Sequence, residues 1–172
     1  MEDNVRHKFD KEFVRLGAYQ FIGGLIGLVL LIYSIYINGF NAIAAIFFLI
    51  IFLFFYGYSI VCGILCLKRH ELALTFSYIN QLLQIIAISI TGYTYKYVAG
   101  LYLSLFFDFT HNINFTFGLG ISNMELQFNT DSNITMLQIN LVAIACMIWI
   151  DKLKGKIKNE ALQMRTEEIG SA

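Results

Sequence analysis

Proline is absent from this chain of 172 residues, and charged residues make up only 14% of it. Without proline, helices are not kinked by that residue, so the broken helices that hold the substrate in many secondary transporters lack their commonest cause. A soluble domain contains about 25% charged residues. Hydrophobic residues instead reach 58%, which is more apolar surface than one core of this size can bury. The composition predicts a single-domain integral membrane protein.

Ionisable residues are missing where membrane chemistry would need them. The apolar stretches 16–67, 72–95 and 134–150 contain no Asp, Glu, Lys, Arg or His. Pumps and coupled transporters place such groups inside the bilayer, and hydrolysis within a membrane needs a positioned base or a metal ion. We therefore expect no catalytic residue, no cofactor and no enzyme activity.

Metal ligands and basic patches are also scarce. Cys62, Cys66 and Cys146 all lie in apolar stretches, and an odd number of thiols at membrane depth does not suggest a disulfide framework. No histidine lies in these stretches, so we expect no metal site. The net charge is zero, which provides no electrostatic basis for binding nucleic acid.

Four apolar runs are long enough to be read as transmembrane helices, since about 20 residues cross the hydrocarbon core. They predict spans at about 18–37, 43–66, 72–92 and 134–150. Before them, Val5, Phe9, Phe13 and Leu16 recur at helical spacing, which predicts an amphipathic cytoplasmic helix over 1–17 on the membrane surface. A solvated charged tail is the alternative. Residues 151–172 are expected to form a cytoplasmic tail.

The lysine and arginine residues predict the orientation. Four precede the first span, two lie in 68–71 and five in the C-terminal tail, whereas 38–41 and 108–133 contain none. Because cytoplasmic loops are enriched in Lys and Arg, both termini are expected in the cytoplasm. The bias toward Ile, Asn, Lys, Phe and Tyr suggests an AT-rich genome, and with it a bacterial inner membrane.

Residues 93–133 alternate between apolar and polar side chains, which is typical of β-strands. They predict an external antiparallel segment with strands near 100–109, 112–121 and 124–130, and turns at 111–112 and 122–123. The competing interpretation is that residues 97–107 extend the third helix. The expected fold is thus a four-helix transmembrane bundle with a small antiparallel β segment between the third and fourth helices.

A polar stripe marks the third span, and two amides lie in the fourth. Such groups form hydrogen bonds between membrane helices or line a hydrated path in an oligomer, and we favour the first role. The stripe and the two amides are Ser77, Asn80, Gln81 and Gln84, with Gln138 and Asn140.

Small residues four apart predict close helix contacts in the first two spans. Gly23 and Gly27 form one pair, and Ser59 and Gly63 form the other. Such pairs allow helix backbones to approach closely. The spacing leaves open whether the partner is a helix of the same chain or of a second copy.

In layout alone the chain resembles tetraspan proteins such as claudins, which also combine four helices with an external sheet. It departs from them because its β segment precedes the fourth span instead of the second, and the claudin W-GLW-C-C signature is missing. It is also similar, in size and span count only, to small multi-pass accessory or effector proteins of bacterial defence loci. No residue role follows from either likeness.

The leading hypothesis is a non-enzymatic assembly, scaffold or accessory subunit in the lipid bilayer. Its expected partner is a second copy or another membrane protein. The alternative is a small oligomeric pore or membrane-permeabilising effector, such as one from a bacterial defence locus.

Overall fold

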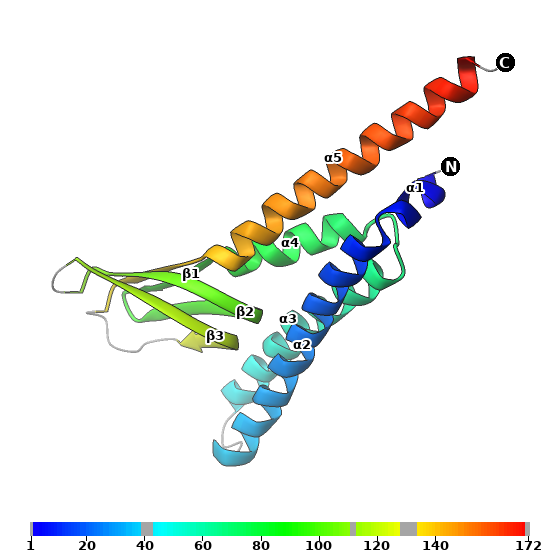
Figure 1. Cartoon of the computed structure of the whole chain (residues 1–172). Coiled ribbons are helices and arrows are strands. Elements are labelled where there is room, and N and C mark those ends of the chain that lie inside the picture. The colour runs from blue at the N-terminus through cyan, green and yellow to red at the C-terminus, as the bar shows by residue number, and fades with distance from the viewer. Residues whose placement is uncertain (1, 39–42, 111–112, 128–133, 171–172) are drawn as a thin grey trace.

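The computed structural model describes residues 2–38, 43–110, 113–127 and 134–170. Within them the chain forms a helical hairpin, a pair of helices and an antiparallel sheet (Figure 1). In chain order the elements are α1 (Glu2–Lys8), α2 (Asp10–Asn38), α3 (Ile43–Leu67), α4 (Ala73–Ile85), β1 (Ile86–Ile90), β2 (Tyr93–Asp108), β3 (Asn114–Gln127), β4 (Met136–Asn140) and α5 (Leu141–Gly170).

The predicted four-helix multi-pass bundle is wrong. Among the described residues only two helices are long and apolar enough to cross a membrane, over Asp10–Ile37 and Ile46–Leu67, by length and composition alone. They correspond to α2 and α3, which pack side by side as the hairpin (Figure 1). The rest of the chain forms a mixed helix and sheet unit beside this hairpin.

The third predicted span, 72–92, is divided between a helix and a strand. α4 has 13 residues, so at about 1.5 Å per residue it covers about 20 Å, less than the roughly 30 Å of a hydrocarbon core. The β1 sequence that follows, IAISI, is rich in isoleucine and alternates, and it pairs with β2 and β4. An apolar run can form either a helix or a strand, and here its pairing with β2 and β4 makes it a strand.

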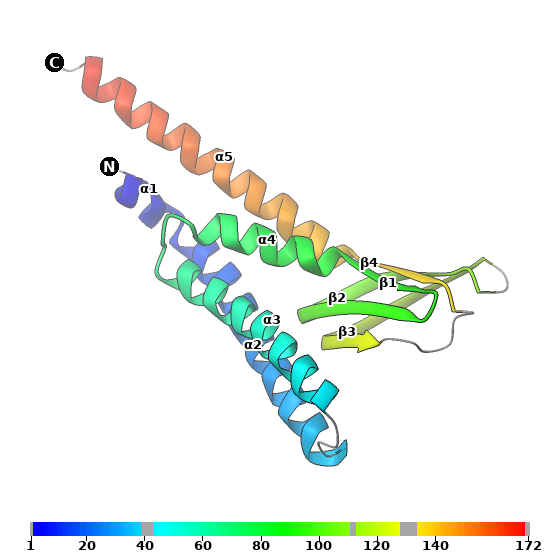
Figure 2. The ribbon, with the colours of Figure 1, turned by 180° about the vertical axis from the view of Figure 1, so that it is seen from behind.

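The fourth predicted span, 134–150, is divided as well. Residues Met136–Asn140 form β4, and α5 begins at Leu141 (Figure 2). The apolar part of α5 ends at Ile150, because Asp151 and Lys152 follow. The helix then continues as a charged rod to Gly170, so the predicted tail is helical.

The sheet has the order β1-β4-β2-β3, and every pairing is antiparallel. β2 is long enough to pair with β1 near its start, where Tyr95 lies opposite Ile88, and with β4 near its end, where Phe107 lies opposite Leu137. Its other side pairs with β3. β1 and β4 also pair with each other, so these three strands curl the sheet into a partly closed unit.

The predicted strands are right in part. The strand near 100–109 lies within β2, so the alternative of a helix over 97–107 is wrong. The strands at 112–121 and 124–130 belong to one strand, β3, and the predicted turn at 122–123 is wrong. The phase change there reflects a register shift in β2 between Val98 and Leu101, a bulge of the kind that reverses which side chains face inward. Residues 111–112 and 128–133 lie outside the described residues.

The N-terminal apolar face packs inside the protein. Val5, Phe13 and Leu16 are buried, and Phe13 and Leu16 belong to a core cluster with residues from α3, α4 and α5, among them Leu74 and Ile150. The segment predicted as one helix over 1–17 is divided between α1 and the start of α2. Protein covers its apolar face where a membrane surface was predicted.

Candidate functional site

The polar stripe of the sequence lies on α4 and faces the interior of the same chain. Ser77, Asn80, Gln81 and Gln84 are all buried. α4 contacts α3, α5 and β2, so the stripe lies at the junction of the hairpin with the rest of the molecule.

Hydrogen bonds connect this stripe to both hairpin helices. The Ser77 hydroxyl donates to Oε1 of Gln20 at 3.2 Å, and Nδ2 of Asn80 donates to the Ser59 hydroxyl at 3.2 Å. Ser59 in turn donates to the backbone oxygen of Gln20 at 3.0 Å. The tyrosine hydroxyl of Tyr97 on β2 lies 3.1 Å from Oδ1 of Asn80. We call these five residues, Gln20, Ser59, Ser77, Asn80 and Tyr97, the central polar cluster.

Tyr97 is the point at which the sheet joins this cluster. Its hydroxyl also lies 2.8 Å from the backbone oxygen of Phe55 in α3. Burial raises the pKa of Tyr97 well above its usual value, so the hydroxyl keeps its proton and acts as a donor. The cluster thus connects α2, α3, α4 and β2 through uncharged groups.

The two glutamines of the stripe differ from each other. Oε1 of Gln84 accepts a hydrogen bond of 2.8 Å from the backbone of Ala99 in β2. Within the described residues, neither side-chain polar atom of Gln81 has a partner, although the residue is fully buried. Nε2 of Gln84 also lacks a partner there. A buried amide without partners costs free energy, so we expect Gln81 to contribute less to the stability of the junction than Asn80 does.

The small residues of the hairpin contact the same chain. Gly63 lies against the backbone of Gly17 and Phe21 in α2, as the small-residue spacing predicts for helix packing. The ring of Tyr56 packs directly against Gly27, where a Cβ would overlap it. Ser59 acts through its hydroxyl in the central polar cluster.

Gly23 contacts the sheet, which the sequence did not predict. A Cβ built on it would lie 2.6 Å from the backbone nitrogen of Gly100 in β2. The Ser122 hydroxyl spans the same contact, since it donates to the Gly23 oxygen at 2.8 Å and accepts from the Gly100 nitrogen at 2.9 Å. Gly100 has φ of +110° at the bulge, a conformation that glycine adopts without strain.

Gln138 and Asn140 lie in β4, outside any membrane-length helix. Nε2 of Gln138 donates to the Ser104 hydroxyl of β2 at 2.7 Å. Oδ1 of Asn140 accepts from the backbone nitrogens of Val142 and Ala143, at 3.1 and 3.4 Å. These are the second and third residues of α5, so Asn140 caps that helix.

A hollow lined by residues of the four strands contains one basic residue, Lys96. Its Nζ lies 5.1 Å from the centre of the Tyr102 ring, and Glu125 is its cross-strand neighbour. Burial lowers the pKa of Lys96, and the Glu125 carboxylate acts in the opposite direction. The hollow around them, about 260 Å³, contains one charge of each sign and is therefore close to balanced.

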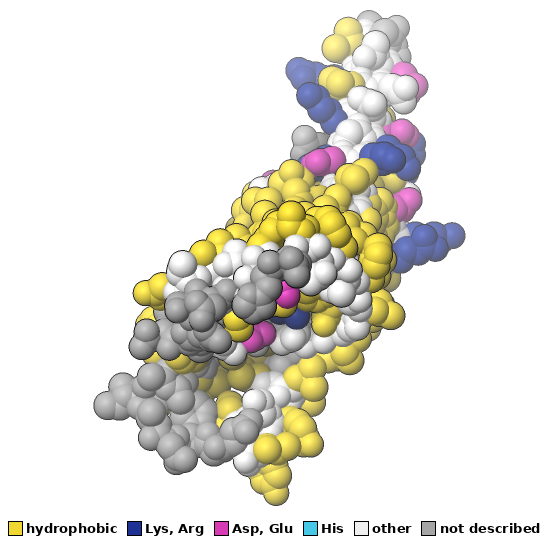
Figure 3. All heavy atoms as spheres, turned by 90° about the vertical axis from the view of Figure 1, so that its left-hand side faces the viewer, with side chains coloured by type: hydrophobic (Ala, Val, Ile, Leu, Met, Phe, Trp, Pro, Cys, Tyr) yellow, Lys and Arg dark blue, Asp and Glu magenta, His cyan; other side chains and the backbone are white. Residues whose placement is uncertain are grey.

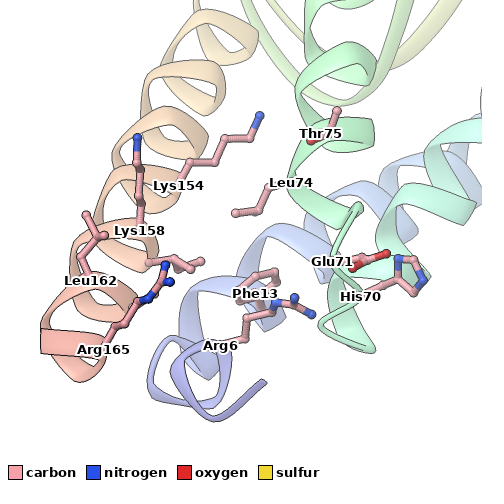
Figure 4. Close-up of a pocket in the computed structure, with 12 residues that line it drawn as sticks. Arg6, Phe13, His70, Glu71, Leu74, Thr75, Lys154, Lys158, Leu162 and Arg165 are labelled. Carbon is pink, nitrogen blue, oxygen red and sulfur yellow. The ribbon is translucent and has the colours of Figure 1, made fainter. Parts of the chain in front are cut away.

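A larger cleft of about 530 Å³ lies at the other end of the molecule, between α5 and the bases of α1, α2 and α4 (Figure 4). We call it the basic cleft, because its charged lining consists of Arg6, Lys154, Lys158 and Arg165 with the single carboxylate of Glu71. The sequence analysis missed it, although a basic residue at every second position from 152 to 158 was a visible signal.

The other face of the sheet is apolar, and it is most exposed along β3. Leu101, Leu103 and Leu105 of β2 lie opposite Ile121, Leu119 and Phe117 of β3. In β3 these side chains are exposed, Phe117 by 75% and Leu119 by 77%. Figure 3 shows hydrophobic side chains covering much of this end of the molecule, while most visible Lys and Arg side chains lie toward the termini.

No group of three or more His, Cys, Asp or Glu residues that could hold a metal ion occurs in the part of the chain that the structure describes. No protein-family model matches the chain, and no curated protein or solved structure is significantly similar to it.

Proposed function

We propose that the chain is a non-catalytic membrane subunit, anchored by the α2–α3 hairpin, that associates with a second copy of itself through the edge of β3. The observation that carries this proposal is the unprotected state of that edge. Among the described strands, β3 pairs with β2 alone, so its other side is available for hydrogen bonding.

Soluble proteins usually protect such an edge with charged residues or proline. Residues 113–124 contain neither. Their exposed apolar side chains add to the hazard, because a long apolar edge strand is a template for pairing with another chain. If the edge reaches the lipid, the need is stronger, since unpaired backbone groups in hydrocarbon cost several kcal/mol each. In either environment a partner strand stabilises this edge.

A second copy of the chain can supply both hydrogen bonds to the β3 edge and an apolar surface that matches its exposed side chains. Two β3 strands paired antiparallel about a twofold axis present the same apolar residues to each other, as isologous contacts require. The exposed faces of β2 and β3 then form one continuous apolar surface across the dimer. The buried amide stripe supports a packing role within each chain, which leaves the pore alternative without its proposed lining.

Two crossings change the proposed position of the sheet. The hairpin returns the chain to the side of the N-terminus, and Arg6, Lys8, Lys68 and Arg69 all flank this end. By the positive-inside rule this end is cytoplasmic. In this proposal the charged C-terminal part of α5 therefore lies in the cytoplasm. The sheet contacts Gly23, inside the uncharged stretch that begins at residue 16, so it lies beside the hairpin, whereas the sequence analysis had expected an external β segment.

The test is the number of subunits in wild-type and edge variants, measured by light scattering in mild detergent and by photobleaching steps in nanodiscs. We expect the wild type to be a dimer and Phe117→Lys/Leu119→Lys to be a monomer with unchanged circular dichroism. Ile169→Lys is the control, because Ile169 is 72% exposed on α5, far along the chain from the edge. A monomeric wild type, or a dimer that survives both edge lysines, contradicts the proposal.

Disulfide scanning identifies the partner. In a cysteine-free background, single cysteines are placed at positions 114–120 in turn. Antiparallel self-pairing brings one position opposite itself, and facing side chains there lie about 4.5–5.5 Å apart between Cβ atoms. We expect oxidation to cross-link one position most strongly and the adjacent positions to a smaller extent. Uniformly weak cross-linking, with a stable dimer, would show that the interface lies elsewhere.

A further inference from the structure

The basic cleft has the composition of a site for a phosphate-bearing amphiphile. Its α5 side presents Lys154, Lys158 and Arg165, whose spacing of four and seven places them on one helix face. None of the three has a carboxylate partner among the described residues. Nζ of Lys154 instead lies 5.1 Å from the centre of the Tyr78 ring on α4.

Apolar side chains lie between these charges and the hairpin. Phe13 of α2 and Leu74 of α4 line the cleft with Ile157 and Leu162 of α5. In Figure 4 Leu74 points into the space between α4 and α5, and Phe13 lies nearer the base. A ligand that fits must therefore combine an anionic group with an apolar part.

The position of the cleft adds a second constraint. It lies at the base of the hairpin, where Phe13 precedes the uncharged stretch that begins at residue 16 and the loop residues His70 and Glu71 follow α3. On the two-crossing orientation proposed above, this is the level of the cytoplasmic headgroups. Anionic lipids of that leaflet attract basic residues close to the membrane.

We propose that the basic cleft binds the headgroup phosphate of an anionic phospholipid, with the phosphate beside Lys158 and Arg165 and the glycerol end against Phe13. The hollow near Lys96 is the weaker candidate for an anion, because Glu125 offsets its single positive charge. In the basic cleft four cationic side chains face one carboxylate. The proposal rests on the membrane orientation of the preceding section and is independent of the β3 interface.

The full chain in nonionic detergent provides the test. Thermal unfolding is followed while short-chain phosphatidylglycerol, short-chain phosphatidylcholine or inorganic phosphate is added, because a ligand of the folded state raises the unfolding temperature, and more so when it binds more tightly. The test variant is Lys158→Gln/Arg165→Gln. The matched control is Lys152→Gln/Lys156→Gln, which removes the same charge from the opposite face of the same helix.

We expect phosphatidylglycerol to stabilise the wild type at a lower concentration than the other two additives. Loss of two basic side chains near an anionic headgroup predicts about thirtyfold weaker binding in the test variant. The control should remain within about twofold of the wild type, since solvent screens its distant charges.

Three results would overturn the proposal. Equal weakening in both double variants would show diffuse charge attraction without a site. Equal stabilisation by the two lipids would remove the role of the anionic headgroup. Inorganic phosphate that binds as tightly as phosphatidylglycerol would show that the basic cleft binds a soluble phosphate and not a lipid. The number of subunits is measured on the same samples, so loss of lipid binding in an intact dimer is separable from failure of the β3 interface.

Discussion

Gly23 of α2 and Gly100 of β2 lie so close that a Cβ on Gly23 would stand 2.7 Å from the Gly100 Cα atom. The membrane-length hairpin and the sheet therefore touch backbone to backbone. The Ser122 hydroxyl closes this contact by hydrogen bonding to both residues. The contact fixes where the sheet, and with it the β3 edge, lies along the hairpin.

Gly23→Ala should separate these two units. The neighbouring atoms are backbone, so they cannot move aside as a flexible side chain would, and overpacking of this kind costs about 1–3 kcal/mol. The matched control is Gly57→Ala in α3, where a Cβ would meet no atom within 4 Å. There alanine should stabilise the helix by up to about 1 kcal/mol. The two changes in unfolding free energy, measured by denaturant titration in detergent, should have opposite signs; a harmless Gly23→Ala would reject the contact.

Leucine at two neighbouring positions of the α4 stripe should change the unfolding free energy differently. Asn80→Leu removes the hydrogen bonds to Ser59 and from Tyr97, at about 0.6 kcal/mol each and up to about 1.7. Gln81→Leu removes an amide that has no partner in the described residues, so stability should stay level or rise. Unfolding free energies of the two single variants and the double variant measure both effects. A loss of stability in Gln81→Leu equal to that in Asn80→Leu would indicate a partner for Gln81 in the assembled protein.

Chemical labelling distinguishes the two-crossing orientation from the four-span one. In a cysteine-free background, an impermeant reagent added outside intact cells should label Gly39→Cys and spare Gln127→Cys and Glu160→Cys. The sequence-based topology placed residue 127 outside, whereas in the two-crossing topology it belongs to the sheet beside the hairpin and is closed to an external impermeant reagent. Permeabilised cells should allow labelling of Glu160→Cys, which controls for access. Labelling of Gln127→Cys from outside would return the sheet to the external side.

The first two predicted spans coincide with α2 and α3 because each apolar run there exceeds 20 residues without a competing pattern. The strand alternation of residues 100–109 was equally readable, since side chains of a strand alternate with a period of two. The stripe on α4 also followed from spacing alone. In each case the sequence pattern lies within one helix or one strand.

The third and fourth apolar runs were different. Their sequences suit a membrane helix and a buried strand equally well, and neither run contains the residues that decide between them. Ile86 pairs with Ile139 and Ile88 with Leu137, so each run becomes a strand because the other lies beside it. Asn140 looked like an amide in a span and instead caps α5 at the end of that strand.

Charge, hydrophobic length and local periodicity thus determined by themselves that the chain carries a membrane-length hairpin with a strand-rich region after it. The tertiary structure decided which apolar runs are strands, what the buried amides bind, and that basic residues distant in sequence, such as Arg6 and Arg165, line one cleft. The physical reason is that strand pairing and cleft formation join residues far apart in the chain, whereas the period of a pattern reports only on neighbours.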